Sequence, residues 1–473
     1  MSDYVLAIDI GTTNVKIALF DIEGNQILVH REKCVSSGEN GSERISALVW
    51  WDALISTIMK IPKDKRHNIR AISISGQGPT IVPVSIKGNF NQKAITWLDN
   101  NHISDIDKII EEKKDPQLAS VIAKLNWLSK RLEKPHYLLQ PADYICHKLT
   151  GKIVNMTFDC DGYIPWNNED LKRFNLADKF TIPELVPTGE IVGHITKEIS
   201  IEFDLSKETV VVSGAPDFAA ALVGTGTVKA GYLCDRGGTS QGVTLCSSKK
   251  VEADGIMTTP YFIKDHWKLS GIMKTSGRAI DWFCSNVAGC DVEKIKTALL
   301  DINHPSNIIF LPYLSGERSP HWNPDARGVF FGLTLDADRN SMLISIMEGI
   351  AFSIADIVER MENSGSEILR IRTTGGQATS DILSQIKADV LNKKIELPHV
   401  YESELLGTAI FAISALRNKD IVEMSSELVK ISKVFVPDSF THEKYLELLK
   451  IYRDIYSHNL DSFTKLAKIQ KHS

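Results

Sequence analysis

The segment that most constrains the fold is YVLAIDIGTTNVKIALFDIEGNQILV, at residues 4–29. It consists of apolar runs rich in Val, Ile and Leu, and two short polar turns separate them, Gly11-Thr12-Thr13 and Glu23-Gly24-Asn25. Apolar runs of this length bounded by Gly and Asn predict β-strands joined by tight turns. The chain is therefore predicted to begin with a three-stranded β-meander.

Strands and helices alternate along the rest of the chain. Short apolar runs that end in Gly or Ser predict three further strands, at 69–75, 209–214 and 368–376. Apolar residues at helical spacing predict three long helices, at 49–61, 118–132 and 341–361. Because strands are followed by helices, the sequence predicts an α/β architecture.

A second Gly-Thr turn suggests two related lobes. In GYLCDRGGTSQGVTLCSS (231–248), Gly238-Thr239-Ser240 repeats the pattern of Gly11-Thr12-Thr13 between two candidate strands. A repeat of this kind predicts duplication, although a match over three residues leaves a chance similarity open. The charged, turn-rich stretch 247–255 is the best boundary. We therefore predict an N-terminal lobe at 1–246 and a C-terminal lobe at 247–473.

The C-terminal tail is predicted to form a helix packed on the second lobe. Apolar residues from His442 onward fall on one helical stripe, and stripes of this kind usually face a core. Its members are Tyr445, Leu448, Leu449, Tyr452, Ile455, Tyr456, Phe463 and Leu466.

Composition narrows the class of partner and the compartment. Lys and Arg total 54 against 59 Asp and Glu, a net charge of −5, so nucleic acid is not expected as a partner. The 7 cysteines form no Cys-x-x-Cys pair, which favours neither a disulfide framework nor a thiolate zinc site. We find no secretory signal and no apolar run long enough to span a membrane. A soluble, cytoplasmic protein without a membrane partner is expected.

The turn after the first strand is a candidate phosphate site. Gly11 allows a tight turn, and donors for phosphate oxygens follow it at Thr12, Thr13 and Asn14. Asp9 ends the strand and could hold Mg²⁺, directly or through water, while Lys16 adds a cation. Neither a Gly-x4-Gly-Lys-Ser/Thr loop nor a Gly-x-Gly-x-x-Gly motif after a strand occurs, so other phosphate-binding devices are expected. An ordinary hairpin with a solvent-facing turn is the alternative.

Asp217 lies where a predicted strand meets an Ala-rich helix, in SGAPDFAAALVGTG (213–226). An aspartate there can cap the helix by accepting hydrogen bonds from its first amides. The same carboxylate can accept a proton from a substrate. The two roles are compatible.

Two further segments have the composition of binding loops. FLPYLSGERSPHWNPDARGVFFGLT (310–334) forms a long run of turn residues, and a structural loop anchored by Trp322 is the alternative. In TTGGQATSDILSQIKADVLNKKI (373–395), Gly375-Gly376 ends a strand and lets a flat ligand such as a nucleoside approach. A plain turn is the alternative there.

Together these segments resemble the successive motifs of the FGGY carbohydrate kinases, from about Tyr4 to about Ala415. The long matches are AIDIGTTNVKIALFD, PDFAAALVGTGTVKAGYLCDRGGTS, PYLSGERSPHWNPDARGVFFGLT and GGQATSDILSQIKADV; the short ones are ISGQG, ITWLD, KLNWL and PADYICHKLTG. The resemblance implies an actin-like ATPase fold, with two similar ribonuclease-H-like lobes around a central cleft. It also implies transfer of the γ-phosphoryl group of ATP to a hydroxyl of a sugar or polyol.

The resemblance assigns a role to each candidate residue. Asp217 would be the general base and, with Asp9, would organise Mg²⁺, while Gln77 and Asp99 would contact the sugar. The phosphate path would be lined by Thr12, Thr13, Asn14, Lys16, Gly238 and Thr239. The nucleotide would be bordered by Gly316, Gly375, Gly376 and Gln377.

The sugar-facing segments depart from the best-known subfamilies. Gly78-Pro79-Thr80 stands where xylulose kinases typically have Met-His-Gly, and Asn100-Asn101-His102 follows Trp97-Leu98-Asp99 where many relatives have Arg after one residue. His102 is a candidate contact or a solvent-facing loop histidine. A ketopentose such as xylulose is the expected substrate, with gluconate, glycerol or another polyol as alternatives.

A protein of a different class would keep the same fold without the reaction. An actin-like ATP-binding scaffold that lacks sugar kinase activity is compatible with the nucleotide motifs, because a fold does not determine a function. A homodimer is also compatible with the resemblance, but the sequence identifies no interface.

Overall fold

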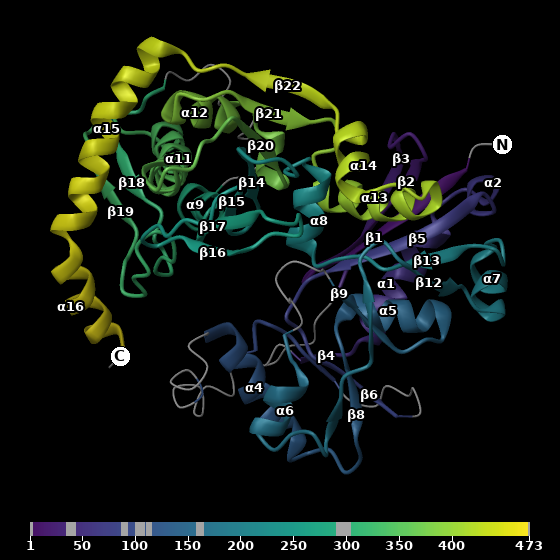
Figure 1. Ribbon diagram of the computed structural model, residues 1–473. Helices are drawn as coiled ribbons and strands as arrows, with labels where there is room; N and C mark the ends of the chain where they lie inside the picture. Colours follow the sequence, from purple (N-terminus) through teal and green to yellow (C-terminus); the bar gives the residue numbers. More distant parts are fainter. Residues whose placement is uncertain are drawn as a thin grey trace. The chain divides into compact units, whose positions relative to one another are not determined.

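The computed structural model describes residues 3–34, 44–86, 93–99, 109, 116–157, 165–289 and 304–471. The chain divides into two compact units (Figure 1). Unit 1 comprises Met1–Gly224 and Glu404–Leu428, and unit 2 comprises Thr225–Ser403 and Val429–Ser473. Each unit is a mixed α/β domain, as the alternation of strands and helices predicts.

Unit 1 is built on a six-stranded sheet of order β12-β13-β5-β1-β2-β3. Its strands are β1 (Tyr4–Ile10), β2 (Asn14–Asp21), β3 (Gln26–Lys33), β5 (Ile69–Gly76), β12 (Ile191–His194) and β13 (Val210–Val212). β1, β2 and β3 form the predicted antiparallel meander, and β1 runs parallel to β5. β1 reads as a continuous apolar run because it is buried on both faces of the sheet.

Helices cover both faces of this sheet (Figure 1). One face packs on α1 (Leu48–Met59), α5 (Pro141–Thr150) and α7 (Lys197–Phe203), whose apolar residues share a core with Leu6, Ile8 and Ile10 of β1. The other face carries α8 (Asp217–Gly224), α13 (Ser403–Arg417) and α14 (Ile421–Leu428). Side chains of a strand alternate between faces, so Asp9 lies on the face of α8 and α13.

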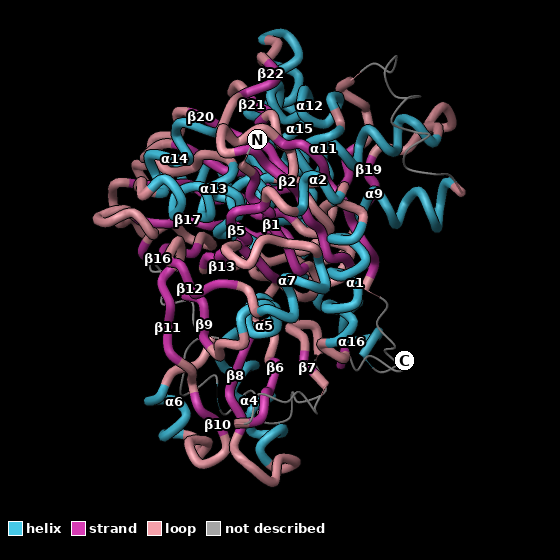
Figure 2. Tube along the Cα trace, turned by 90° about the vertical axis from the view of Figure 1, so that its right-hand side faces the viewer, coloured by secondary structure: helices cyan, strands magenta, loops and turns pink. Residues whose placement is uncertain are grey.

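A smaller layer at one end of unit 1 carries the predicted sugar segments (Figure 2). It contains a three-stranded sheet, β6 (Val82–Ser85), β8 (His136–Leu139) and β10 (Phe180–Thr181), and the helices α4 (Pro116–Ser129) and α6 (Asn168–Arg173). Two-stranded ladders join β4 (Arg44–Ile45) to β7 (Ala94–Ile95) and β9 (Val154–Thr157) to β11 (Glu184–Pro187). A short helix, α2 (Lys63–Arg66), precedes β5.

Unit 2 repeats the sheet of unit 1. Its seven strands have the order β16-β17-β15-β14-β20-β21-β22. They are β14 (Tyr232–Gly237), β15 (Gln241–Ser247), β16 (Met257–Pro260), β17 (Trp267–Met273), β20 (Arg370–Thr374), β21 (Ile395–Pro398) and β22 (Ile431–Phe435). From β17 to β22, every neighbouring pair has the same direction as its counterpart from β3 to β12 in unit 1. This shared order supports the duplication suggested by the two Gly-Thr turns.

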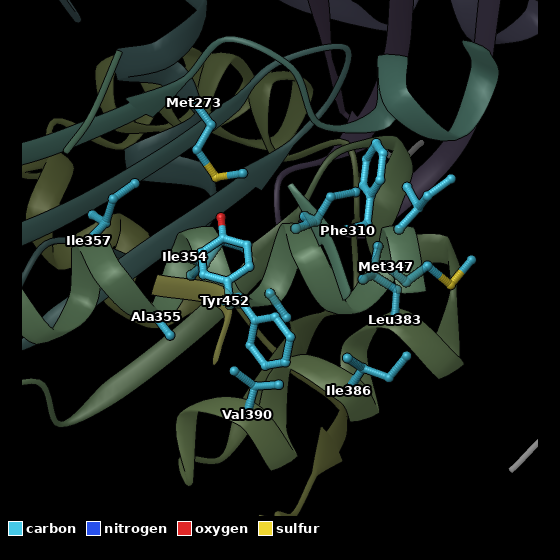
Figure 3. Packing of buried hydrophobic residues seen from close by; sticks show 14 of the residues in the cluster. Met273, Phe310, Met347, Ile354, Ala355, Ile357, Leu383, Ile386, Val390 and Tyr452 are labelled. Carbon is cyan, nitrogen blue, oxygen red and sulfur yellow. The ribbon is translucent and has the colours of Figure 1, made fainter. Parts of the chain in front are cut away.

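The core of unit 2 forms around α11 (Arg339–Asn363). Figure 3 shows Ile354 and Ile357 of this helix with Met273 of β17 and Tyr452 of α15 (Ser439–His458) in the same apolar cluster. The cluster also includes residues of α9 (Gly277–Phe283), α12 (Asp381–Leu391), α16 (Leu460–Lys471) and β18 (Ile309–Leu311), which pairs with β19 (Val329–Phe331). Among the described residues, α11 is the helix long and apolar enough to cross a membrane, and 89% of its apolar window is buried inside the protein.

The boundary between the units differs from the predicted one at residues 246 and 247. β14 and β15 belong to unit 2, because β14 pairs with β20 and β15 pairs with β17. The stretch 247–255 connects two strands of one sheet instead of two lobes. Residues Glu404–Leu428 return to unit 1. The distribution of turn residues along the chain could not reveal this return.

The C-terminal tail packs on unit 2 as predicted, in two helices. The stripe residues Tyr445, Leu449, Tyr452, Ile455 and Phe463 are buried in its core. Leu466 is an exception, since its side chain is exposed. α15 ends at His458 and α16 begins at Leu460; within α16, Phe463 and Ala467 are buried, while Leu466 lies on another side of the helix.

Candidate functional site

Asp9 is a buried carboxylate at the carboxyl end of β1. It is 5% exposed, and its Oδ1 accepts a hydrogen bond from Ser75 Oγ at 3.0 Å. Burial raises the pKa of Asp9 to about 7, because a charged carboxylate is poorly solvated there. A charge that is costly to bury needs a cation or a donor beside it.

The start of α8 brings Asp217 to the same end of the sheet. Pro216 forms a bridge with Gly76, the last residue of β5, and Gly76 lies beside β1 in the parallel ladder. The Oδ1 of Asp217 accepts a hydrogen bond from the Phe218 amide at 2.5 Å. Asp9 and Asp217, both predicted to follow or end a strand, therefore lie at one edge of the same sheet.

Several charges converge on Asp9. Lys16, which lies opposite Asp9 in the β1–β2 ladder, lowers its pKa, while the carboxylates of Glu404 and Asp217 raise it. The site thus holds three carboxylates and one lysine close enough to interact electrostatically. The described residues include no group of three or more His, Cys, Asp or Glu side chains that could hold a metal ion, so a cation here would keep ligands from water or substrate.

Glu404 is a site residue that the sequence analysis missed. It lies in the first turn of α13, and α13 packs closely on α8: a Cβ added at Gly407 would lie 1.8 Å from the Ala220 carbonyl oxygen. Only a glycine lets the two helix backbones approach this closely. The sequence signal for this packing was Gly407, a glycine within an apolar helix. It did not identify α8 as the partner helix, so it could not place Glu404 near Asp9.

The first Gly-Thr turn has the polar character predicted for a phosphate site. The Gly11 amide donates to the Asn14 carbonyl oxygen at 2.9 Å, which closes the turn between β1 and β2. Asn14 Nδ2 donates to Thr13 Oγ1 at 2.9 Å, and Trp97 Nε1 donates to Thr12 Oγ1 at 3.2 Å. The hydroxyl groups of both threonines therefore accept a hydrogen bond, and each keeps its own proton for another acceptor.

Gln77 lies beside a small cavity near the start of α8. Its Oε1 accepts from Thr80 Oγ1 at 2.8 Å, while its Nε2 is buried with no hydrogen-bond partner among the described residues. The cavity of about 20 Å³ is lined by Gln77 together with Asp143, Met156 and Pro216. A space of this size accommodates one water molecule or hydroxyl group.

Asp99 is held in a buried ion pair. Arg44 Nε lies 3.2 Å from its Oδ2, and the charge of Asp99 also acts on the buried Lys124. A sugar that contacts this carboxylate would have to share it with Arg44. The candidate contact His102 and the neighbouring Asn100 and Asn101 lie outside the described residues.

The second Gly-Thr turn is supported by the start of α9. The Gly238 amide donates to the Ser240 carbonyl oxygen at 2.9 Å, and the Gly277 amide donates to the Gly238 carbonyl oxygen at 3.0 Å. Gln377 Nε2 donates to the same Gly238 oxygen at 3.3 Å and to Ser276 Oγ at 2.7 Å. The predicted phosphate residue Gly238 and the predicted nucleotide residue Gln377 are therefore neighbours in unit 2.

Gly375 and Gly376 also lie beside the second Gly-Thr turn. Gly375 has φ +82°, and a Cβ added to it would lie 2.5 Å from the Gly237 carbonyl oxygen, so both its conformation and its surroundings require glycine. A Cβ at Gly376 would meet no described atom within 4 Å. Beside Gly376 there is room for a ligand.

A buried network lies beneath this turn. Lys387 Nζ is 2.7 Å from Asp235 Oδ2, and both side chains are 1% exposed. Asp235 also accepts hydrogen bonds from Gln241 Nε2 and Thr373 Oγ1. Ser276 Oγ donates to Gln241 Oε1 at 2.8 Å, so the network reaches Gln377 through Ser276. No local pattern indicates this network, because Asp235 and Lys387 are 152 positions apart.

The segment 310–334 forms an ordered loop beside the start of α9. Thr275 Oγ1 lies 2.9 Å from Ser315 Oγ, which places Gly316 next to that start. Gly316 has φ +76°, and a Cβ on it would lie 2.6 Å from the Pro324 carbonyl oxygen. Trp322, the anchor of the alternative structural loop, is 50% exposed, and its indole Nε1 donates to the Gly255 carbonyl oxygen at 3.1 Å. Tyr313 and Phe310 are the buried aromatic residues of this segment, and the Tyr313 hydroxyl lies 2.6 Å from that of Tyr452 in α15.

His321 joins this loop to α15 by ring stacking. Its imidazole lies 3.9 Å from the Tyr456 ring centroid at an interplanar angle of 24°. Burial, with a smaller contribution from Arg360, lowers the pKa of His321 to about 4. Asp356 Oδ2 lies 3.9 Å from His321 Nε2, but that carboxylate already pairs with Arg453 at 2.7 Å. We therefore consider the buried imidazole to be neutral.

Acidification is expected to destabilise unit 2 through His321. The folded protein binds a proton at His321 less well than the unfolded chain, whose histidine pKa is 6.5. The stabilising contribution is complete above that pKa and is lost as the pH falls towards about 4, by about 3 kcal/mol in total. Between about pH 7 and about pH 4.5, the denaturation temperature should therefore fall less steeply in His321→Phe than in the parent protein. The phenylalanine keeps a ring that can stack but cannot take up a proton. Equal slopes for the two proteins would contradict the assignment.

Comparisons with known proteins match both halves of the chain to one family. The model of the FGGY family of carbohydrate kinases, N-terminal domain, matches residues 4–224, and the C-terminal domain model matches residues 236–416. The first match ends at Gly224, where the first segment of unit 1 ends, and the second begins within β14 of unit 2. Both agree with the structural boundary and not with the one predicted at 246.

Individual relatives are similar over nearly the whole chain. Gluconokinase of Bacillus subtilis (strain 168) is 25% identical, with 100% of this chain and 99% of the relative covered. Xylulose kinase of Staphylococcus xylosus is 27% identical, with 96% and 99% covered. The crystal structure of ligand-bound xylulose kinase from Lactobacillus acidophilus superposes with a TM-score of 0.84 at 23% identity, covering 98% of this chain and 100% of that one. This likeness confirms the predicted actin-like ATPase fold.

Proposed function

Because this chain belongs to the FGGY family of carbohydrate kinases, we propose that it transfers the γ-phosphoryl group of ATP to a hydroxyl group of a small sugar, with Asp217 as the general base. The observation that carries the proposal is the position of Asp217, beside Asp9 and at the end of the sheet that bears the first Gly-Thr turn. Phosphoryl transfer requires a base for the acceptor hydroxyl and donors for the phosphate oxygens. Both are present at this end of unit 1.

In the proposed reaction Asp217 accepts the proton of the sugar hydroxyl as the oxygen of that hydroxyl attacks the γ-phosphorus. The bond from the γ-phosphorus to the bridging oxygen of ADP breaks, and ADP leaves. Thr12 and Thr13 donate their hydroxyl protons to phosphate oxygens, and Lys16 offsets part of the negative charge. In unit 2, the nucleotide is bound by the cluster at the second turn, Gly238, Thr239, Gly375, Gly376 and Gln377, with Gly316 beside it.

The residues around Asp9 fit a magnesium ion. Asp9 and Asp217 supply two carboxylates, and the charge of Asp217 raises the cost of ionising Asp9. Mg²⁺ prefers few carboxylates and keeps water or phosphate ligands. Asp9 would hold the ion, directly or through water, together with Asp217. When bound, the ion would offset charge on the phosphates.

The proposed acceptor is a ketopentose such as xylulose. Similarity to xylulose kinases supports it, while similarity to gluconokinase supports gluconate as the next candidate. Glycerol or another polyol is third. A cytoplasmic location and a homodimer remain predictions, as does the lack of nucleic acid and membrane partners.

A coupled assay of ADP release tests the proposal. The purified protein is incubated with ATP, Mg²⁺ and one compound at a time from a panel of pentuloses, hexuloses, polyols and aldonic acids. We expect D-xylulose to raise ADP release most. A larger response to gluconate or glycerol would replace the proposed acceptor and keep the kinase. If no compound raises ADP release above background, an ATP-binding scaffold becomes the better interpretation.

A further inference from the structure

Trp97 connects the predicted sugar side of unit 1 to the first Gly-Thr turn. It follows β7, in the smaller layer, and its indole Nε1 donates to Thr12 Oγ1 at 3.2 Å, although the two residues are 85 positions apart. The Thr12 turn follows β1 of the main sheet. This hydrogen bond therefore joins two layers of unit 1.

The backbone of Trp97 is held at both of its polar groups. Its amide donates to Thr80 Oγ1 at 3.3 Å, and Thr80 in turn donates to Gln77 Oε1 at 2.8 Å. Its carbonyl oxygen accepts from the buried Lys124 Nζ at 3.3 Å. The residue is thus fixed to Gln77, the predicted sugar contact, by two successive hydrogen bonds, while its side chain remains 41% exposed.

The direction of the indole bond is unambiguous. An indole N–H can only donate, so the Thr12 hydroxyl must be its acceptor. The hydroxyl proton of Thr12 is therefore not used in this bond, and the bond restricts the directions in which it can point. A hydroxyl group oriented in this way is a better donor to a phosphate oxygen than one that rotates freely, because less orientational freedom is lost in the transition state.

We propose that Trp97 is a positioning residue for phosphoryl transfer: through its indole N–H it orients the Thr12 hydroxyl, and through Thr80 it couples this orientation to Gln77. The inference rests on the proposed function, since it assigns Thr12 to the phosphate path. Trp97 acts through Thr12 and is not itself assigned a contact with the reacting atoms.

Kinetic analysis of Trp97→Phe tests the proposal, because phenylalanine keeps an aromatic ring and lacks the donor. One hydrogen bond to a neutral group corresponds to roughly a 3- to 10-fold effect. We expect kcat to fall by about that factor, while the KM for the sugar changes by less than about 2-fold. A merely structural role would instead lower the denaturation temperature and leave the ratio of kcat to the KM for the sugar unchanged.

A double-mutant cycle with Thr12 identifies the hydrogen bond as the cause. In a Thr12→Ser background, which keeps the hydroxyl group, Trp97→Phe should lower kcat as it does in the parent protein. In a Thr12→Val background, which lacks the hydroxyl group, Trp97→Phe should have no further effect. Independent, multiplicative losses in the Thr12→Val background would overturn the proposal, and so would an increase in the KM for the sugar with kcat unchanged.

Trp51→Phe is the matched control. Trp51 is a buried residue of α1, beside Phe203 and in the core on the opposite face of the sheet from Asp9. Its replacement should leave kcat within about 2-fold of the parent, whatever it does to stability. If the parent protein itself shows no sugar-dependent ADP release, the proposed function fails. The coupling between Trp97 and Thr12 is then measured by calorimetric titration of the parent, Trp97→Phe, Thr12→Val and the double variant with MgATP, where additive changes would overturn it independently.

Discussion

Replacing Asp217 by Asn is expected to abolish most sugar phosphorylation and to leave nucleotide binding intact. The amide keeps the shape of the side chain and an oxygen that accepts from the Phe218 amide, but it cannot take up the proton of the sugar hydroxyl. General-base catalysis contributes roughly 10²- to 10⁴-fold, so kcat should fall by a factor in that range. The coupled assay measures kcat, and calorimetric titration with MgATP measures binding.

Asp52→Asn is the control for this prediction. Asp52 is an exposed residue of α1, so the same chemical change there should leave both kcat and MgATP binding unchanged. Turnover at the parent rate in Asp217→Asn would remove Asp217 from the role of base. A loss of MgATP binding together with activity would show that the carboxylate acts mainly through the metal or the nucleotide, and the role of base would pass to another group.

Replacing Lys387 by Met is expected to destabilise unit 2 severely. The variant would leave Asp235 buried without its cation, in a site where both side chains are 1% exposed. Removing one partner of a buried ion pair typically costs about 3–5 kcal/mol, because the remaining charge is neither solvated nor paired. Chemical denaturation measures this loss as a lower midpoint of unfolding. MgATP binding should weaken as well, since the network below Gly238 and Gln377 includes Asp235.

The double variant Asp235→Leu with Lys387→Met tests the origin of that loss. Both charges are removed, so no unpaired charge remains, and the double variant should be more stable than Lys387→Met alone. If the double variant is less stable than the single one, loss of the hydrogen bonds that Asp235 accepts from Gln241 and Thr373 outweighs removal of the unpaired charge, and the unpaired carboxylate does not account for the effect.

Local patterns were sufficient to predict the strands and turns that carry the candidate site. β1 and β5 coincide with apolar runs, because a strand buried on both faces has to be apolar along its length. β20 is more polar, and the glycines that follow it marked its end. The two Gly-Thr turns marked the duplication, which the shared strand order of the two sheets supports. In these cases a residue and its near neighbours contain the required information.

The predicted boundary at 246 failed for a physical reason. Turn residues mark where a chain changes direction, and 247–255 does so within a single sheet. Membership of a unit depends on which strands pair, and β14 finds its partner in β20, more than a hundred residues later. Trp322, the anchor of the alternative loop, is half exposed, because the size of an aromatic side chain does not determine which way a loop turns it.

The amino-acid sequence by itself determined the α/β class, the family motifs, the position of Asp217 at a strand end and the glycines around the second turn. Only the tertiary structure decided that Glu404 joins Asp9, that Lys387 neutralises Asp235 and that Trp97 contacts Thr12. The first group depends on backbone conformation and on the alternation of polar and apolar residues over a few positions. The second depends on side chains from distant segments, whose approach is set by the packing of whole helices and sheets.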